Sequence, residues 1–167
     1  MEKIIFVDPE HCSGCRICEA VCSFSKTGTI RPSASRIKVQ NWFVDGISVP
    51  IVCLNCETPY CAAVCPTKAI YKDGDGIVHL EKDKCINCKK CIQACPFGAI
   101  GLDPELNEII KCDLCGGDAL CTQFCPTDAL IFVEPTRIGE INRRKRMLKQ
   151  ANAQYGLEET VRTVLGG

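Results

Sequence analysis

Short apolar runs alternate with turn-forming residues along most of this chain, and that alternation predicts a series of β-hairpins. Asp-Gly pairs, or a turn that contains Pro104 and Asn107, separate the two strands of each hairpin. The predicted strand pairs are residues 69–72 with 77–80, residues 99–102 with 108–111, and residues 36–43 with 47–52. Two further strand candidates, residues 3–7 and 129–133, would pair with each other and close the domain.

The end of the chain follows a helical pattern instead. Apolar residues recur there every seven positions among basic ones, at Ile141, Leu148 and Tyr155. This spacing predicts a helix up to Gly156, and residues 157–165 would add a second one. Single helical turns are expected where segments such as residues 92–95 end in a cysteine. Together the elements predict an α+β fold of short hairpins and short helices, followed by a helical tail.

Sixteen cysteines divide without remainder into four sets of similar spacing. Two sets follow C-x2-C-x2-C-x3-C, and the other two lengthen the middle gap to four and five residues. The sets are Cys12, Cys15, Cys18 and Cys22; Cys53, Cys56, Cys61 and Cys65; Cys85, Cys88, Cys91 and Cys95; and Cys112, Cys115, Cys121 and Cys125. Proline follows the last cysteine of three sets, whereas Ser23 follows Cys22. A repeat of this kind predicts one local structure built four times.

So many thiols in 167 residues indicate either a disulfide scaffold or metal binding. The apolar run at residues 4–7 is too short for the core of a signal peptide, and no apolar stretch reaches the length of a membrane helix. We therefore expect a soluble cytoplasmic chain without a membrane span, whose thiols stay reduced. In that compartment clustered cysteines are metal ligands more often than bridges.

The spacing also distinguishes between metals. Structural zinc takes four ligands per site, often as two C-x2-C pairs, and does not explain triplets followed by a fourth cysteine and proline. The C-x2-C-x2-C-x3-C-P run is typical of 4Fe–4S clusters, and in two-cluster ferredoxins its fourth cysteine binds the other cluster. The sequence therefore predicts four 4Fe–4S clusters held by all sixteen cysteines.

On these motifs, residues 3–133 resemble the four-cluster, ferredoxin-like iron–sulfur subunits of molybdenum and tungsten oxidoreductases, such as those of the dimethyl sulfoxide reductase type. The resemblance implies tandem bacterial dicluster ferredoxin-like units, in which the first run interlocks with the fourth and the second with the third. The ligand sets that it implies are Cys12, Cys15 and Cys18 with Cys125; Cys112, Cys115 and Cys121 with Cys22; Cys53, Cys56 and Cys61 with Cys95; and Cys85, Cys88 and Cys91 with Cys65.

The resemblance also implies a role in electron transfer without catalysis by the chain itself. The partner would be a catalytic subunit of tungstopterin or molybdopterin type, as in tungsten aldehyde:ferredoxin oxidoreductase-like complexes. A flavin subunit, a ferredoxin or further copies of the chain could complete the assembly. Formate dehydrogenase, hydrogenase and carbon monoxide dehydrogenase complexes are alternative settings. An autonomous iron–sulfur enzyme or sensor, and a structural metal protein, are rival classes; a catalytic cluster usually offers an open iron site or lacks a cysteine, and neither occurs here.

Charge divides the chain into an acidic body and a basic tail. Residues 1–133 carry 13 basic and 16 acidic side chains, whereas residues 134–167 carry 7 and 4. We therefore expect a four-cluster domain at 1–133, with a hairpin insert at 25–52, and a helical tail at 134–167. The tail would either pack on the acidic body or serve as a docking arm for a partner. Nucleic-acid binding is not expected, because no recognition module accompanies the basic residues.

A few other side chains could contribute to such sites. His11 and His79 are expected at exposed polar positions rather than as ligands, since cysteines already supply every cluster. Trp42 and Phe43 fit either core packing or a partner interface. A group of apolar residues beside the cysteines is expected to keep water from the clusters: Ile17, Val64, Ile86, Ile92, Phe97 and Phe124.

Overall fold

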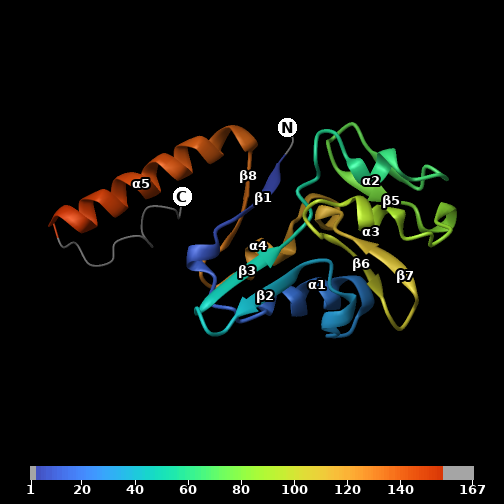
Figure 1. The fold of residues 1–167 in the computed structure, drawn as a ribbon, viewed down its shortest axis with the longest axis horizontal. Helices are drawn as coiled ribbons and strands as arrows, with labels where there is room; N and C mark the ends of the chain where they lie inside the picture. The colour runs from blue at the N-terminus through green and yellow to red at the C-terminus, as the bar shows by residue number, and fades with distance from the viewer. Residues whose placement is uncertain (1–2, 156–167) are drawn as a thin grey trace.

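The computed structural model describes residues 3–155, in which short strands and helices are joined by tight turns (Figure 1). Its strands are β1 (Ile4–Val7), β2 (Lys38–Trp42), β3 (Ile47–Ile51), β4 (Ile70–Lys72), β5 (Val78–Leu80), β6 (Ile100–Asp103), β7 (Glu108–Lys111) and β8 (Leu130–Val133). Its α-helices are α1 (Ile17–Thr27), α2 (Tyr60–Ala63), α3 (Lys90–Ala94), α4 (Leu120–Gln123) and α5 (Ile138–Tyr155). Five single turns of 3-10 helix complete the described range: η1 (Pro9–His11), η2 (Pro32–Ala34), η3 (Lys82–Lys84), η4 (Leu114–Gly117) and η5 (Pro135–Arg137).

Within residues 3–155 the strands form four two-stranded antiparallel sheets. Three are the hairpins β2–β3, β4–β5 and β6–β7, and the fourth joins β1 to β8 with Ile5 opposite Phe132. The predicted hairpins and the closing pair of terminal strands are therefore confirmed, and so is the α+β fold class. The predicted tail helix also forms, as α5, whereas the second tail helix at residues 157–165 lies outside the described residues.

Helix α1 is longer than the single helical turn that the sequence predicts. It runs for 11 residues and buries one face, which carries Cys18 and Cys22 one turn apart together with Glu19 and Ser23. The helix ends at Gly28, whose φ of 73° is easy for glycine and whose N–H donates to the Phe24 carbonyl. The amphipathic pattern of α1 is hard to see in the sequence because its buried face carries polar residues. One of them, Glu19, accepts a hydrogen bond from the Val39 N–H.

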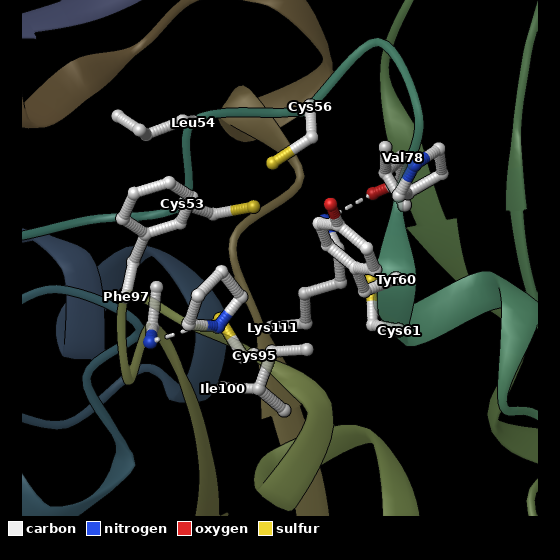
Figure 2. A pocket seen from close by; sticks show the side chains of 13 residues that line it. Cys53, Leu54, Cys56, Tyr60, Cys61, Val78, Cys95, Phe97, Ile100 and Lys111 are labelled. Atoms are coloured by element: carbon white, nitrogen blue, oxygen red, sulfur yellow. Dashed lines mark hydrogen bonds between the residues drawn. The ribbon is translucent and has the colours of Figure 1, made fainter.

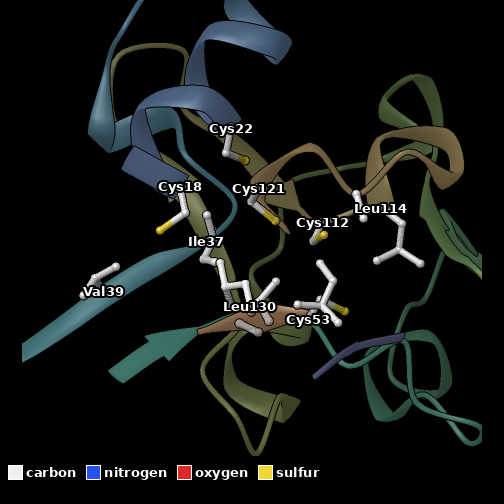
Figure 3. Packing of buried hydrophobic residues seen from close by; sticks show 13 residues of the cluster. Cys18, Cys22, Ile37, Val39, Cys53, Cys112, Leu114, Cys121 and Leu130 are labelled. Atoms are coloured by element: carbon white, nitrogen blue, oxygen red, sulfur yellow. The ribbon is translucent and has the colours of Figure 1, made fainter. Parts of the chain in front are cut away.

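The buried interior consists of cysteines and aliphatic side chains in two clusters. The larger lies between α1, α4 and the β1–β8 pair, and Figure 3 shows several of its cysteine sulfurs turned inward beside Ile37 and Leu130. The smaller lies under the β4–β5 and β6–β7 hairpins, around Ile70, Val78 and Ile100. Since Cys95 packs against both clusters, they adjoin one another.

Apolar residues beside the cysteines are partly exposed. Most of the residues expected to shield the cysteines have exposed side chains: Ile17, Val64, Ile86, Phe97 and Phe124. Phe97 and Ile86 nevertheless lie against cysteines, together with buried residues such as Val78. Trp42 and Phe43 are exposed at the tip of the β2–β3 hairpin, which excludes core packing, one of their two expected placements.

The insert at residues 25–52 is tied to the body by a buried ion pair. The two guanidinium nitrogens of Arg31 lie 2.7 Å from the two carboxylate oxygens of Asp103 at the end of β6. At the far end of the molecule, α5 extends away from the body (Figure 1), and its first turns are held by buried Ile141 and by an ion pair between Lys145 and Asp8. No described helix is both long and apolar enough to span a bilayer.

Candidate iron–sulfur centres

Four cysteines from two different runs surround one cavity, which we call the Cys53 cavity. Cys53, Cys56 and Cys61 come from the second run, and Cys95 comes from the third. Figure 2 shows the sulfurs of Cys53, Cys56 and Cys95 directed into the same space. Its other walls are largely apolar and include Tyr60, Phe97 and Ile100.

Two more cavities among the described residues repeat this arrangement. The Cys85 cavity is lined by Cys85, Cys88, Cys91 and Cys65. The Cys112 cavity is lined by Cys112, Cys115, Cys121 and Cys22. In each cavity three cysteines belong to one run and the fourth to another.

The remaining four cysteines, which we call the Cys12 set, are Cys12, Cys15, Cys18 and Cys125. Burial raises the pKa of the Cys18 thiol to about 12, and nearby Cys125 and Cys15 raise it further by their charge. Cys12 and Cys125 both pack against the larger core cluster, which contains Cys18. The structure thus brings members of the first and last runs together, across 107 positions of sequence between Cys18 and Cys125.

The backbone of each run repeats a left-handed turn between its first two cysteines, which the cysteine spacing does not predict. The residue two positions after the first cysteine has a positive φ in every run: Gly14, Asn55, Asn87 and Leu114. This left-handed conformation curls the chain between the first two cysteines. Glycine and asparagine tolerate it, so the signal was present in three runs, whereas Leu114 adopts it with a buried side chain.

A second repeated turn follows the last cysteine of three runs. The third residue after it has a positive φ: Lys68, Gly98 and Asp128. Each of these residues donates its N–H to the carbonyl of the preceding cysteine, at 3.2–3.5 Å. The proline after the cysteine restricts φ and lacks an N–H, which favours this fixed exit from the site. The Ala99 N–H then lies 3.4 Å from the Cys95 sulfur, as a donor to the thiol or thiolate.

The thiols are buried enough to resist ionisation when no metal is bound. Burial raises the pKa of Cys91 to about 11 and that of Cys112 to about 12, and it raises the pKa of Cys121 as well. Cys65 differs: burial acts to raise its pKa, but hydrogen bonds from Ile70 and Thr67 lower it below the usual value. Metals bind thiolates, so loading these sites must release protons.

The donor sets fit a cluster with four iron corners. Each cavity offers four thiols, and its walls provide apolar groups that would limit access of water. Among the described residues, no three Cys, His, Asp or Glu side chains converge tightly enough for a single metal ion.

The two histidines are placed differently from the exposed positions expected. Both are half-buried against an aspartate: His11 Nδ1 lies 2.7 Å from Asp8, and His79 Nε2 lies 2.5 Å from Asp73. Neither lines one of the three cysteine cavities. Lys111, in contrast, lines the Cys53 cavity. The only sign in the sequence that it could lie near a site is its position directly before Cys112.

Comparison with known families agrees with this construction. Residues 44–135 match the model of a 4Fe-4S dicluster domain, and residues 9–25 match that of a 4Fe-4S binding domain. The chain belongs to the 4Fe-4S dicluster domain family. Since the first match covers more than half of the chain, the iron–sulfur character expected from the motifs is confirmed.

Several curated proteins are similar to the dicluster region. A polyferredoxin-like subunit of aliphatic sulfonate oxidoreductase from Pyrococcus furiosus is 45% identical over 93 residues, which are 55% of this chain and 53% of that protein. Electron transport protein HydN of Escherichia coli is 37% identical over 105 residues, 60% of this chain and 59% of HydN. A subunit of anaerobic dimethyl sulfoxide reductase from Escherichia coli is 37% identical over 117 residues, 62% of this chain and 54% of that subunit. The matches thus span little more than half the length of these relatives.

Among solved structures, a component of the active site complex BamBC of benzoyl coenzyme A reductase is similar over most of its length. It is 25% identical, with a TM-score of 0.48, and the match covers 92% of this chain and 91% of that one.

Proposed function

We propose that this chain is a non-catalytic electron-transfer subunit that carries four 4Fe–4S clusters in a row. The main support is the cross-run lining of the three cavities, since each set of four thiols repeats the interlocked ligation of two-cluster ferredoxins. When bound, the clusters would supply one-electron redox chemistry. All sixteen cysteines then serve as ligands, in the four sets that the resemblance implies.

Packing in the core supports an order for the four sets, since Cys95 packs against both core clusters and Cys53, Cys112 and Cys18 belong to the larger one. Besides burial, the charge of Cys61 contributes to the raised pKa of Cys91, which connects the Cys85 and Cys53 cavities. Cys53 acts in the same way on Cys112, and Cys18 acts on Cys121. The proposed path therefore runs from the Cys85 cavity through the Cys53 and Cys112 cavities to the Cys12 set.

In this proposal the protein's own groups hold the clusters, fix the loops around them and limit the access of water to them. Thiolates would hold the irons, and the left-handed turns fix the loops that carry them. Buried aliphatic side chains such as Ile37 and Leu130 limit access of water beside the cysteines. Exposed Phe97 and Tyr60, on the rim of the Cys53 cavity, lie where a partner could cover them.

The proposed partner is a catalytic oxidoreductase subunit that contains tungstopterin or molybdopterin, in a setting like tungsten aldehyde oxidoreductases. Relatives named as subunits of aliphatic sulfonate oxidoreductase and dimethyl sulfoxide reductase support an oxidoreductase complex. A flavin subunit or a ferredoxin would exchange electrons at the other end of the path. We place the complex in the cytoplasm, where cysteines stay reduced.

Anaerobic purification with the catalytic partner tests this function. The expected result is about sixteen irons and as many sulfides per chain, with electron paramagnetic resonance spectra of several interacting clusters. Fewer than about twelve irons per chain would contradict the four-cluster proposal. Substrate turnover by the isolated chain would contradict the assignment as a non-catalytic subunit.

A further inference from the structure

Lys111 is a buried lysine whose side chain enters the Cys53 cavity. It is the last residue of β7, pairs with Ile100 across the hairpin, and is 5% exposed. Figure 2 shows its side chain beside the sulfurs of Cys53, Cys56 and Cys95, on the side of the cavity nearer Tyr60 and Cys61. Lysine is almost never this deeply buried unless it is paired.

The ammonium group of Lys111 is compensated by carbonyl dipoles. Its Nζ donates to the carbonyl oxygen of Val78 and, at 2.7 Å, to that of Cys112. Among residues 3–155 no carboxylate forms an ion pair with it. The positive charge beside the cavity is therefore not cancelled by a neighbouring negative side chain.

Cations beside the other two cavities are placed differently. Lys26 borders the Cys112 cavity, but its ammonium lies 2.7 Å from the Asp113 carboxylate. Arg36 borders the same cavity, but it is only half-buried, and its guanidinium donates to the Ala34 carbonyl. Lys89 and Lys90 border the Cys85 cavity, but both are exposed to solvent, which screens their charge. A lysine that is both buried and without an acidic partner distinguishes the Cys53 cavity from these two.

We propose that Lys111 raises the reduction potential of the cluster held by Cys53, Cys56, Cys61 and Cys95. This inference rests on the proposed function, because it requires a cluster in that cavity. Reduction adds one electron to the cluster and so one negative charge, with no bond made or broken in the protein. A fixed positive charge in a medium of low dielectric constant stabilises that added charge more than it would in water.

The position of Lys111 also determines which clusters should change in reduction potential. Its Nζ bonds to the carbonyl of Cys112, which belongs to the next cavity on the proposed path. The charge of Lys111 likewise favours the thiolates of Cys61 and Cys112, against the opposing and larger effect of burial on their pKa values. We therefore expect the largest change at the Cys53 cavity, a smaller one at the Cys112 cavity, and little elsewhere.

The test is a redox titration of the purified, cluster-loaded complex, followed by electron paramagnetic resonance. In Lys111→Gln the amide can still donate a hydrogen bond but carries no charge. We expect the equilibrium constant for reduction of one cluster to fall at least tenfold, a shift of about 59 mV for a one-electron couple. Lys111→Arg retains the charge and should keep the potential near that of the native chain. A Cys56→Ser variant identifies the titration step that belongs to this cavity.

Lys82→Gln is the matched control. Lys82 is exposed and pairs with Glu108, which lies on β7, the strand that also carries Lys111. The substitution should shift no potential. A Lys111→Gln protein with full iron content and unchanged potentials would overturn the proposal. Loss of iron in Lys111→Gln that Lys111→Arg restores supports a need for the charge, whereas loss in both variants would show that only the shape of lysine matters. If the native chain itself lacked a cluster in this cavity, that result would contradict the proposed four-cluster function, on which the role of Lys111 depends.

Discussion

Cys95 shows how a single residue can belong to one repeat by sequence and to another by structure. It ends the third run, ten residues after Cys85, yet it lines the cavity of Cys53, Cys56 and Cys61. Its counterpart Cys65 ends the second run and lines the Cys85 cavity. The two residues have exchanged sites, so each run depends on the other to complete its set of thiols.

This exchange makes opposite predictions for two serine substitutions. Cys95→Ser should remove or alter the cluster of the Cys53 cavity and leave that of the Cys85 cavity unchanged, because serine is a poor substitute for a thiolate. The expected loss is up to about a quarter of the iron, one cluster of four. Iron analysis and electron paramagnetic resonance of the reduced protein would measure it.

The matched substitution Cys65→Ser serves as the control for that experiment. It should affect the Cys85 cavity instead, and the two variants should lose different spectral components. If Cys95→Ser changed the component that depends on Cys85, Cys88 and Cys91, the cross-run ligation would be wrong.

At the level of elements, the hairpins are small and are stabilised mainly by contacts with distant segments. Two-stranded hairpins are only marginally stable alone, so each needs packing or polar links to the rest of the chain. The bidentate pair of Arg31 with Asp103 provides such a link between η2 and β6. Asp103 also accepts hydrogen bonds from the Glu105 and Leu106 N–H groups, which fix the turn between β6 and β7.

Replacement of Asp103 should therefore destabilise this part of the fold. In Asp103→Asn the charge that neutralises Arg31 is lost, and we expect the free energy of unfolding to fall by about 2 kcal/mol at pH 7. Thermal unfolding of the loaded protein under anaerobic conditions would measure the change. Glu105→Gln is the control, since its carboxylate lies 3.1 Å from Arg31 but is largely exposed, and a surface pair contributes little.

The same pair predicts a pH dependence with a definite sign. The hydrogen bonds from Arg31 hold the pKa of Asp103 below its ordinary value of 3.8 in the folded chain. A group with a depressed folded pKa contributes its stability above the unfolded pKa and loses it as pH falls through the folded pKa. The difference in stability between the native chain and Asp103→Asn should thus be constant near neutral pH and shrink below about pH 4. A difference that grew on acidification would contradict this account.

At the scale of the whole molecule, each of the four cysteine sets contributes at least one buried member to the core, with Cys91 in the smaller cluster, although Cys15 and Cys88 are exposed. Cys18, Cys22, Cys53, Cys112 and Cys121 are all members of the larger buried cluster. Removal of the clusters would leave three groups of four thiols facing one another without the bonds to metal that join them. Metal binding and folding should therefore be closely coupled.

Removal of iron by a chelator under reducing conditions tests this coupling. We expect the near-ultraviolet circular dichroism to fall and backbone amide exchange to rise throughout β4–β7, because these hairpins pack on cluster ligands. Helix α5 should be less affected, since its described contacts are with the segment around Asp8 and with its own neighbours. An apoprotein with native exchange protection in β4–β7 would show that the fold forms without its clusters.

The tail can be tested as a docking arm separately from the cluster domain. In the structure α5 contacts the body through Ile141, Lys145 and Lys149, and the two lysines pair with carboxylates in the segment before Cys12. Deletion of residues 136–167 should leave the iron content unchanged and weaken association with the catalytic partner at least tenfold, or about 1.4 kcal/mol. Size-exclusion chromatography and titration calorimetry of the complex would measure it, and an unchanged affinity would refute the docking arm.

Features that depend on covalent chemistry and on neighbouring residues could be predicted from the sequence alone. The cysteine spacing predicted iron–sulfur sites, because few other metal centres are bound by three closely spaced cysteines followed by a fourth cysteine and a proline. Short apolar runs around turn residues predicted the hairpins, and apolar residues spaced seven apart among basic ones predicted α5. Each of these signals lies within a single run, hairpin or helix, so no knowledge of distant contacts was needed.

Spacing within the chain does not predict which distant groups meet or which stay at the surface; the pairing of Cys95 with Cys53 was expected only from the family resemblance, and the rest is visible only in the folded chain. There Cys95 lies with Cys53, Lys111 is buried in their cavity, and Phe97 is exposed on its rim. The physical reason is that burial and shared cavities depend on the packing of segments far apart in sequence. A charged residue after an apolar strand, such as Lys111, looks like a solvent-exposed strand end until the neighbouring hairpin covers it with the Val78 carbonyl.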